Sequence, residues 1–316
     1  MEELVSIIMP ACNSELFIKR AVDSVLNQSY ENIELIIVDS SENNITKILL
    51  KKINDKRIKY YNIGKATCGG ARNYGVMKSF GNIITFLDSD DVYLEGKIEK
   101  QVNFLKNNFY DVVYCQAAHY YTDEPNIKYK LKMNYKSGNL TEEILHGTFI
   151  NINTIMMNKN IFESVGCFGE GDPFPEDWEL YLKIALSGYE FGFIDEILVE
   201  NELRRNRTVT NEIQSKIKQN AIYMMENVLK KYGKSIPDSK KFDVLLRLKY
   251  KCCIAYIMNG KKKEAIVLFN SIKLSRYFIA FPVILILVIL PRNIVSVILG
   301  KLFIRRRHAR VFEKMQ

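Results

Sequence analysis

Four short apolar segments alternate with helix-like segments in the first part of the chain, and this order constrains the fold more than any other feature. The apolar segments are 4–9, 33–38, 58–63 and 83–87, and the residues that follow them are Pro10, Asp39, Gly64 and Asp88. Continuous apolar strands separated by helices predict a parallel sheet covered on both faces. Ligands of such sheets bind beyond the carboxyl ends of the strands, so we expect these four residues to form one edge of a nucleotide pocket.

A cluster of acidic residues follows the fourth apolar segment directly. Asp88, Asp90 and Asp91 stand close together in the sequence, and carboxylates this close repel one another unless a cation lies among them. A hard divalent ion, Mn²⁺ or Mg²⁺, is the expected cofactor, because it binds one or two carboxylates and completes its shell with substrate phosphates. The alternative is a solvated acidic turn that caps the next helix.

The rest of the chain continues the α/β pattern and then becomes helical. We expect a helix at 95–106, strands at 112–115 and 150–157, a mobile loop at 120–141, a helix at 176–186 and short strands at 191–199. Amphipathic helices at 210–232 and 242–258 would lie outside the sheet. The expected fold class is therefore α/β with a C-terminal helical extension.

Positive charge is concentrated in the tail of the chain. Lys and Arg number 45 against 36 Asp and Glu, which gives a formal net charge of +9. The segment from residue 276 onward holds eight Lys or Arg and one acidic residue, so it carries +7 and the preceding residues carry +2. A nearly neutral body argues against a nucleic-acid-binding surface and indicates an interaction tail.

The basic tail is also apolar. Residues 277–290 form an apolar run interrupted by Pro282, and the run resumes at 294–299 and 302–304 before three successive arginines. None of these apolar stretches reaches the roughly 20 residues that a membrane-spanning helix needs. We expect residues 276–316 to lie on anionic lipid at the cytoplasmic face of the cell membrane, as a peripheral or monotopic helical pair. A helical hairpin packed on the domain is the alternative.

Cysteine and histidine usage gives little support to a structural metal or disulfide framework. The six cysteines lack C-x-x-C spacing, and only three histidines are present. Free thiols in a reducing cytosol fit this composition. The N-terminus lacks a basic segment followed by an apolar one, so no secretory signal is expected.

Five sequence motifs follow one another in a particular order. They are VSIIMPACN at 5–13, SVLNQSYENIELIIVDS at 24–40, GGARNYG at 69–75, FLDSDD at 86–91 and PEDWELYLKIALSGY at 175–189. Each motif alone is weak, but together they make the chain resemble family-2 glycosyltransferases with the GT-A fold, a Rossmann-like fold of nucleotide-diphospho-sugar transferases. The resemblance covers roughly 5–210. We expect a glycosyltransferase domain at 1–210, with a nucleotide-binding half at 1–100 and an acceptor half at 101–210. Residues 211–275 would form the helical extension.

The resemblance also implies roles for individual residues. Asp39 corresponds to the acid that hydrogen-bonds the uracil N–H of a UDP-sugar. Asp90 corresponds to the metal ligand, and Asp177 to the catalytic base. The other implied residues are Pro10, Ala11 and Cys12 beside the base, Arg72 and Asp88 near the donor, and Glu176 and Trp178 near the acceptor.

Glycosyl transfer explains why these residue types would be needed. Departure of the nucleotide leaves negative charge on the diphosphate, which a divalent ion on Asp90 would neutralise. The acceptor hydroxyl must lose a proton, which Asp177 would accept as a general base. Because Asp177 begins a helix, we expect the helix N-terminus to favour its ionised form. In-line attack assisted by a single base would invert the anomeric centre.

The chain departs from the family pattern at three places. Cys12 stands where tyrosine is common, and the segment that begins with Asp39 keeps only the first acid of the usual D-D-G-S. Leu-Arg-Arg-Asn at 203–206 replaces the usual Tyr-Arg-x-His, so we expect no third metal ligand there. Arg204 and Arg205 would instead meet the diphosphate, or would belong to an exposed basic loop.

Each assignment also has a structural alternative. Asp39 could merely cap the helix that follows it, and Glu176 and Asp177 could be ordinary helix-start residues. Arg72 could form a surface ion pair, and Trp178 could be a core residue.

The predicted activity is that of an inverting, metal-dependent hexosyl- or N-acetylhexosaminyltransferase. The donor would be a nucleotide sugar, with UDP preferred, and the acceptor a hydroxyl of a glycan or lipid-linked precursor in bacterial cell-surface polysaccharide synthesis. The alternatives are a catalytically inactive nucleotide-binding partner in a glycan-assembly complex, a nucleotidyltransferase and a dinucleotide-dependent enzyme; the missing G-x-G-x-x-G fingerprint argues against the last. The prediction requires Asp39, Asp90 and Asp177 to converge on one cleft.

Overall fold

The chain forms two compact units in a computed structural model that describes residues 2–169, 171, 173–204, 210–271 and 312–315. The first unit comprises 1–172, 176–205 and 313–316, and it contains the sheet. The second comprises 173–175 and 206–312, and helices make up most of its described part. The predicted division into a nucleotide-binding half and an acceptor half stays a prediction.

The sheet of the first unit has a parallel centre, as the sequence predicts. β1 lies between β2 and β4, and β3 pairs with the other side of β2. These four parallel strands are β1 Val5–Ala11, β2 Ile33–Asp39, β3 Ile58–Asn62 and β4 Ile83–Phe86. Every residue of β1, β2 and β4 is buried, which explains their continuous apolar character.

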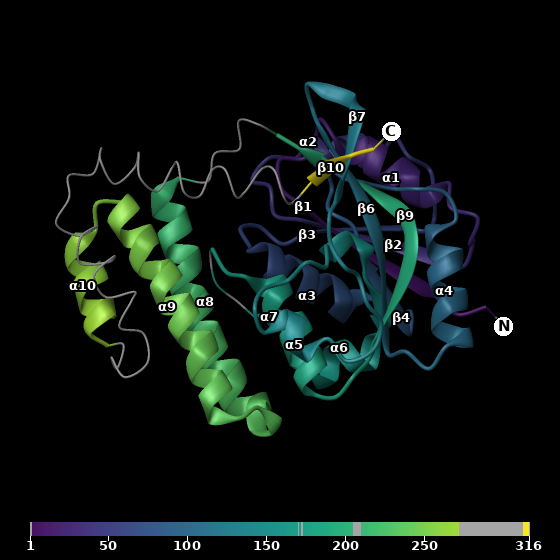
Figure 1. The fold of residues 1–316 in the computed structure, drawn as a ribbon. Coiled ribbons are helices and arrows are strands. Elements are labelled where there is room, and N and C mark those ends of the chain that lie inside the picture. The colour runs from purple at the N-terminus through teal and green to yellow at the C-terminus, as the bar shows by residue number, and fades with distance from the viewer. Residues whose placement is uncertain (1, 170, 172, 205–209, 272–311, 316) are drawn as a thin grey trace. The chain divides into compact units, whose positions relative to one another are not determined.

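Helices cover both faces of this parallel centre (Figure 1). Residues of α1 and α4 share a core cluster with Val5, Ile7 and Met9, which point to one face of β1. On the other face, α3 lies against Ile8. The helices that precede or lie between the strands of this unit are α1 Ile18–Leu26, α2 Ile45–Leu50, α3 Cys68–Lys78, α4 Lys97–Asn107, α5 Thr141–Ile144, α6 Lys159–Ser164 and α7 Glu176–Leu186.

The sheet continues beyond β4 with antiparallel and mixed pairing. β8 joins β4 to β6 in antiparallel fashion, β9 runs parallel to β6, and β5 pairs with β9. The bounds are β5 Val92–Tyr93, β6 Val112–Tyr121, β7 Glu124–Leu131, β8 Met156–Asn158 and β9 Phe191–Leu203, with a short 3-10 helix at Ile152–Thr154. The predicted strand at 150–157 is therefore mostly loop and 3-10 helix, and the strand predicted at 191–199 is one longer strand.

The prediction of a mobile loop at 120–141 is wrong for its first part. β6 and β7 form an antiparallel hairpin, and β7 is also bordered by β10, Phe312–Lys314. The ladder register shifts between Tyr120, which faces Lys128, and Tyr121, which faces Glu124. This irregularity takes Pro125 out of the regular ladder, so a proline that suggested a loop is compatible with a strand.

Proline also fails to end the first strand where the sequence predicts. β1 continues through Pro10 and Ala11, which face Val38 and Asp39 of β2. On its other side, the β4 register ends at Ile8, which faces Phe86. Beyond Ile8, β1 therefore forms a single ladder, and a residue without an N–H is tolerated there.

The second unit contains the helices that were predicted outside the sheet. They are α8 Asn211–Tyr232, α9 Asp238–Met258 and α10 Lys262–Asn270. Thr210 begins α8 with a side-chain oxygen that accepts a hydrogen bond from the Ile213 N–H at 3.3 Å. The apolar run at 277–290 and most of the predicted membrane-associating tail lie outside the described residues. No helix within the described ranges combines the length and apolarity that crossing a membrane requires.

Candidate functional site

The GGARN motif places α3 unusually close to its neighbours. A Cβ added at Gly75 would lie 2.4 Å from Cγ2 of Ile8, so only glycine lets the helix approach β1 this closely. A Cβ added at Gly69 would lie 3.0 Å from the carbonyl oxygen of Gly169, in the segment before α7. These two approaches fix the position of Arg72, which lies between the two glycines on the same helix.

Arg72 brings together acidic residues from two distant parts of the sequence. Its guanidinium lies 2.7 Å from Oδ1 of Asp88, 3.3 Å from Oε1 of Glu176 and 3.6 Å from Oδ1 of Asp177. The side chain is only 3% exposed, so the alternative of a surface ion pair is wrong. Although burial acts to lower its pKa, attraction by Asp88 and Asp177 raises the pKa of Arg72, which stays charged.

Asp177 begins α7 with one oxygen turned into the protein. Its side chain is 32% exposed, but Oδ1 is shielded from solvent and has no hydrogen-bond partner among the described residues. Burial raises the pKa of Asp177 to about 7, against the attraction of Arg72 and with further repulsion from Glu176 and Asp88. The expected preference of the helix N-terminus for the ionised form is thus outweighed, and the group is poised near neutral pH.

A pair of amide hydrogen bonds fixes the segment that leads into α7. Nδ2 of Asn73 donates to the carbonyl of Phe168, and Oδ1 of Asn73 accepts from the Phe168 N–H, each at 3.0 Å. The Phe168 ring packs against Phe86 and Phe162 and lies 5.6 Å from the Arg72 guanidinium. Sequence reasoning missed Asn73 as a site residue, although its place beside Arg72 in the ARN motif was the available signal.

Asp39 ends β2 with both carboxylate oxygens bound by the protein. Oδ1 accepts from the Ser41 N–H and Oδ2 from the hydroxyl of Tyr60, each at 2.8 Å, and the residue is fully buried. The carboxylate therefore does not cap the following helix, which has no side-chain cap. Tyr60 was missed because its partnership with Asp39 depends on the register of β2 and β3.

The end of β1 contacts both neighbouring strand ends. The Asn13 N–H donates to Oγ of Ser41 at 2.8 Å, and Oγ of Ser14 lies 2.7 Å from Oγ of Ser89. Through the end of β1, these bonds join the loop after Asp39 to the acidic loop, which is the segment 88–91 that follows β4. Of the three residues expected beside a base, Cys12 is exposed, whereas Pro10 and Ala11 are buried within β1.

Asp91 is a buried structural member of the acidic cluster. It accepts hydrogen bonds from Nδ2 of Asn153 at 2.6 Å and from the Glu202 N–H at 2.8 Å. Oδ1 of Asn153 in turn accepts from the Asp88 N–H at 2.8 Å. Burial, with added repulsion from Asp88 and Asp90, raises the pKa of Asp91 to about 8. Sequence reasoning missed Asn153, because it stands inside an otherwise apolar run.

Asp90 of the acidic loop forms an ion pair with Arg204. Oδ2 of Asp90 lies 2.9 Å from the Arg204 guanidinium, which also lies 4.1 Å from the Phe17 ring centroid. The main-chain carbonyl of Asp90 accepts a hydrogen bond from Arg20 at 2.7 Å. Arg205 lies outside the described residues, so its place beside the diphosphate stays a prediction.

The donor set suits a divalent ion that shares its shell with a substrate. Within the described ranges, no three His, Cys, Asp or Glu residues are arranged as a metal site. A single carboxylate such as Asp90 fits the usual protein share of a Mg²⁺ or Mn²⁺ shell when phosphate oxygens supply other ligands. The chemistry of the residues therefore fits the predicted ion only together with a phosphorylated donor.

Trp178 is anchored by its indole nitrogen. Nε1 donates to the carbonyl of Ile144, at the end of α5, at 2.5 Å. The Trp178 side chain is half-buried, so part of it is accessible to solvent. The residue directly follows Asp177 in the sequence. Its predicted role with an acceptor stays a prediction.

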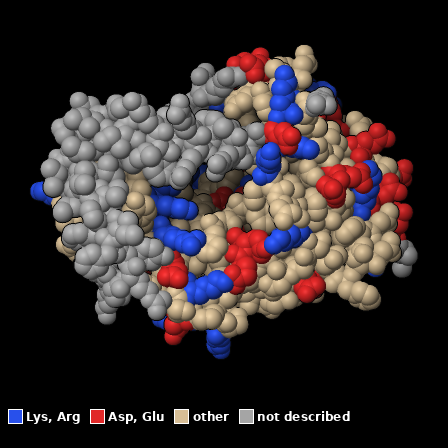
Figure 2. All heavy atoms as spheres, viewed as in Figure 1, with Lys and Arg blue, Asp and Glu red and all other residues tan. Residues whose placement is uncertain are grey.

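On the face shown in Figure 2, acidic and basic side chains are interspersed over the described surface, with no single-sign patch dominating it.

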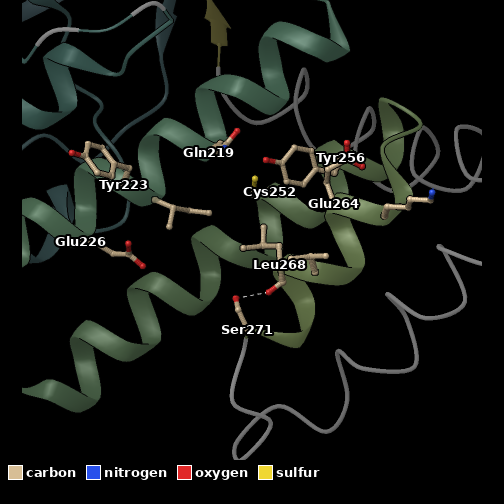
Figure 3. Close-up of a pocket in the computed structure, with 11 residues that line it drawn as sticks. Gln219, Tyr223, Glu226, Cys252, Tyr256, Glu264, Leu268 and Ser271 are labelled. Atoms are coloured by element: carbon tan, nitrogen blue, oxygen red, sulfur yellow. Dashed lines mark hydrogen bonds between the residues drawn. The ribbon is translucent and has the colours of Figure 1, made fainter.

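The helical unit holds an open cavity of about 590 Å³ (Figure 3). Side chains of α8, α9 and α10 line it, among them Ile222, Tyr223, Cys252, Tyr256 and Leu268.

Comparison with known proteins assigns the chain to a family. Residues 6–166 match the sequence model described as "Glycosyl transferase family 2". The chain belongs to this family. An uncharacterized glycosyltransferase of Rickettsia typhi is 30% identical over 220 residues, which are 66% of this chain and 67% of the relative. The present chain is also 30% identical to Escherichia coli UDP-Glc:alpha-D-GlcNAc-diphosphoundecaprenol beta-1,3-glucosyltransferase WfaP. The match covers 73% of this chain and 87% of WfaP.

Solved structures agree on the fold. Staphylococcus aureus TarS 1–349 in complex with UDP matches with a TM-score of 0.60 at 15% identity, over 94% of this chain and 91% of that one. The complex of the same protein with UDP-GlcNAc matches with a TM-score of 0.57, over 84% of each chain. The glycosyltransferase therefore has the predicted GT-A fold, followed by C-terminal helices.

Proposed function

We propose that this glycosyltransferase inverts the anomeric centre of a hexose or N-acetylhexosamine that it moves from UDP to a hydroxyl of a lipid-linked glycan. One observation carries the proposal: a single buried arginine, Arg72, contacts both Asp88 of the acidic loop and Asp177 of α7. The acidic loop is the expected donor side and α7 the expected acceptor side. The two halves of the reaction thus have candidate groups in one cluster of charged residues.

On the donor side, Asp39 would accept the uracil N–H. Each carboxylate oxygen has two lone-pair positions, so the bonds from Ser41 and Tyr60 leave acceptor capacity. Exposed Cys12 would lie beside the base, with Pro10 and Ala11 behind it. UDP and UDP-GlcNAc are bound in the TarS complexes, and UDP-Glc is the donor in the name of WfaP, which supports UDP as the proposed nucleotide.

On the acceptor side, Asp177 would act as the general base. It takes the proton of the acceptor hydroxyl, whose oxygen attacks the anomeric carbon from the face opposite the diphosphate. The bond from that carbon to the diphosphate oxygen breaks, and UDP leaves with the electron pair. Glu176 and Trp178 would contact the acceptor sugar.

Charge on the departing diphosphate needs compensation. Arg204, and Arg205 after it, would donate hydrogen bonds to the phosphate oxygens. A divalent Mn²⁺ or Mg²⁺ held by Asp90 would supply further positive charge when bound. Because Arg204 contacts Asp90 directly, the same carboxylate would orient the arginine before the donor arrives.

The proposed acceptor and location are based on the names of two relatives. The names of two E. coli relatives specify a GlcNAc-diphosphoundecaprenol acceptor, which is a membrane lipid. We therefore propose a lipid-linked acceptor in cell-surface polysaccharide synthesis and action at the cytoplasmic face of the membrane. Attachment through the apolar and basic tail at 276–316 remains part of the proposal.

A donor screen tests the proposal. The full chain, purified in mild detergent, is assayed for release of UDP, GDP or CMP from the corresponding sugars with Mn²⁺ and a GlcNAc-diphospho-lipid. UDP release with formation of a disaccharide lipid of inverted configuration is expected. Binding of UDP without any transfer would instead support the inactive-partner alternative. Asp23→Asn, an exposed acidic residue paired only with Lys19 in the described contacts, is the matched control for acidic-site variants.

A further inference from the structure

Three buried polar atoms without hydrogen-bond partners belong to residues that interact electrostatically with one another. They are Nε of Arg72, Oδ1 of Asp177 and the hydroxyl of Tyr181, each unpaired among the described residues. Buried polar atoms are nearly always hydrogen-bonded, so a group of three at one place points to an unfinished network. Tyr181 has not been given a role by the reaction described above.

Helix geometry directs Tyr181 toward Asp177. The two residues stand four apart on α7, so their side chains lie on the same face of the helix. Side chains of a helix lean toward its N-terminus, which brings the later residue over the earlier one. Tyr181 is fully buried, and it lies within electrostatic range of Asp177, Arg72, Asp88 and Glu176.

Packing alone does not account for the Tyr181 hydroxyl. A buried hydroxyl without a partner is unfavourable, whereas phenylalanine would fill the same space without that penalty. Burial, with repulsion from Asp177, raises the pKa of Tyr181 well above its ordinary value, so the hydroxyl keeps its proton and can only donate to a carboxylate.

The two oxygens of Asp177 face different surroundings. Oδ1 is shielded from solvent and faces Arg72 at 3.6 Å, while the side chain as a whole is 32% exposed. The exposed part therefore lies on other atoms, which leaves Oδ2 as the oxygen able to meet an acceptor hydroxyl. A donor that holds Oδ1 would fix the rotation of the carboxylate and thereby aim Oδ2.

We infer that Tyr181 is a positioning residue for Asp177: its hydroxyl, which has no hydrogen-bond partner among the described residues, turns to donate to Oδ1 when Asp177 ionises, so that Oδ2 is held toward the acceptor. This inference rests on the proposed role of Asp177 as the general base. The charged and titratable groups that face Asp177 are Arg72 and Cys68 of α3, Asp88 after β4, and Glu176 and Tyr181 of α7. Among them, Tyr181 is a neutral donor, so it favours the ionised base without adding charge.

The test is Tyr181→Phe in the full chain, with kcat/KM measured across pH 5.5–9. A donor to the ionised carboxylate lowers its pKa, so removing that donor raises it and moves the acidic limb of the profile to higher pH. We expect the acidic limb to shift by about one pH unit. At pH values below the pKa of the base, kcat/KM of the variant should therefore be about tenfold lower than that of wild type. The KM for the UDP-sugar should not change.

Tyr114→Phe is the matched control. Tyr114 is also fully buried, but its hydroxyl donates to the Lys136 carbonyl at 2.7 Å, away from the acidic cluster. This variant should lose thermal stability and keep the wild-type pH profile. An unchanged profile in Tyr181→Phe would overturn the inference, even if its activity fell.

A second measurement is independent of turnover. NMR titration of ¹³C-aspartate-labelled protein, with Asp177→Asn to assign the signal, gives the pKa of Asp177 in wild type and in Tyr181→Phe. A higher value in the variant supports the inference, and equal values contradict it. Wild-type protein that titrates as expected but transfers no sugar would refute the proposed function and leave the hydrogen bond itself supported.

Discussion

The guanidinium of Arg72 on α3 lies 3.6 Å from Oδ1 of Asp177 at the start of α7. The same guanidinium holds Asp88 at 2.7 Å, so one buried cation joins the acidic loop after β4 to the beginning of α7. A buried ion cluster of this kind is sensitive to loss of either sign of charge, because the remaining charges are left unpaired. The relationship therefore ties the stability of the first unit to the proposed chemistry.

Replacing Arg72 with methionine should both destabilise the fold and stop transfer. Three carboxylates would lose their shared partner, and the free energy of unfolding at pH 8 should fall by ~3–5 kcal/mol. The loss should be smaller at pH 5, because Asp177, whose pKa is raised to about 7, becomes protonated and no longer needs the cation. Urea unfolding followed by fluorescence of Trp178, the only tryptophan, measures both values.

Lys19→Met is the control for Arg72→Met. Lys19 forms an exposed pair with Asp23, and such pairs contribute about 0–1 kcal/mol. An Arg72→Met variant as stable as Lys19→Met at pH 8 would contradict the buried-cluster account.

Asn73→Ala should weaken the coupling of α3 to the segment before α7. Two hydrogen bonds to the Phe168 main chain are lost, which should lower the free energy of unfolding by ~1–3 kcal/mol. Because Phe168 lies near Arg72, kcat should also fall while the KM for the donor changes little. Asn108→Ala, which removes an exposed bond to Phe104, should leave both quantities near wild type. An Asn73→Ala variant that is as stable and as active as wild type would show that the two Asn73–Phe168 hydrogen bonds do not hold this segment in place.

Metal removal tests the role proposed for Asp90. Treatment with EDTA should abolish transfer, and Mn²⁺ or Mg²⁺ should restore it, because the diphosphate charge is otherwise uncompensated. Asp90→Ala should lower kcat/KM at least a hundredfold at saturating Mn²⁺, and excess metal should not rescue it. Asp23→Asn should behave as wild type in the same assay. Full activity of the wild-type chain in EDTA would rule out the ion.

Lys97 predicts a pH dependence of stability that has a different origin. It is fully buried, donates to Oε1 of Gln101 at 2.6 Å, and burial lowers its pKa from 10.5 to about 7. The folded protein therefore binds fewer protons at Lys97 than the unfolded chain between pH 7 and 10.5, so this residue makes stability rise with pH in that window. Below pH 7 its burial is simply unfavourable.

The comparison of wild type with Lys97→Met isolates this effect. Between pH 6.5 and 9, the difference in unfolding free energy should move in favour of the wild type by ~2.5 kcal/mol. Lys100→Met changes an exposed lysine on the same helix and should show no such trend. A difference between wild type and Lys97→Met that is flat across this range would mean that Lys97 is not titrating as described.

The parallel centre of the sheet and the positions of its acids could be predicted from the sequence. Strands that are buried on both faces appear as unbroken apolar runs, and the residues after them lie at one edge because parallel strands end together. This is why Asp39 and Asp88 were found as site candidates from their place alone. The acidic run after β4 added Asp90, and the family motifs added Arg72 and Asp177.

The contacts within the site could not be predicted in the same way. The meeting of Arg72 with Asp177 depends on how closely α3 approaches β1 and the segment before α7, which the glycines permit but do not specify. Tyr60 reaches Asp39 through strand register, and Asn153 is masked by apolar neighbours. The β6–β7 hairpin was missed because an edge strand with charged residues and a proline lacks the apolar signal of a central strand.

The most direct test of the central claim is Asp177→Asn, which keeps the shape of the side chain and removes its capacity to accept the acceptor proton. We predict that transfer from the UDP-sugar falls at least a thousandfold, while UDP binds with wild-type affinity by calorimetry. The wild-type enzyme should lose activity below about pH 7, where Asp177 becomes protonated. An Asp177→Asn variant that transfers sugar within a few-fold of wild type would contradict the account.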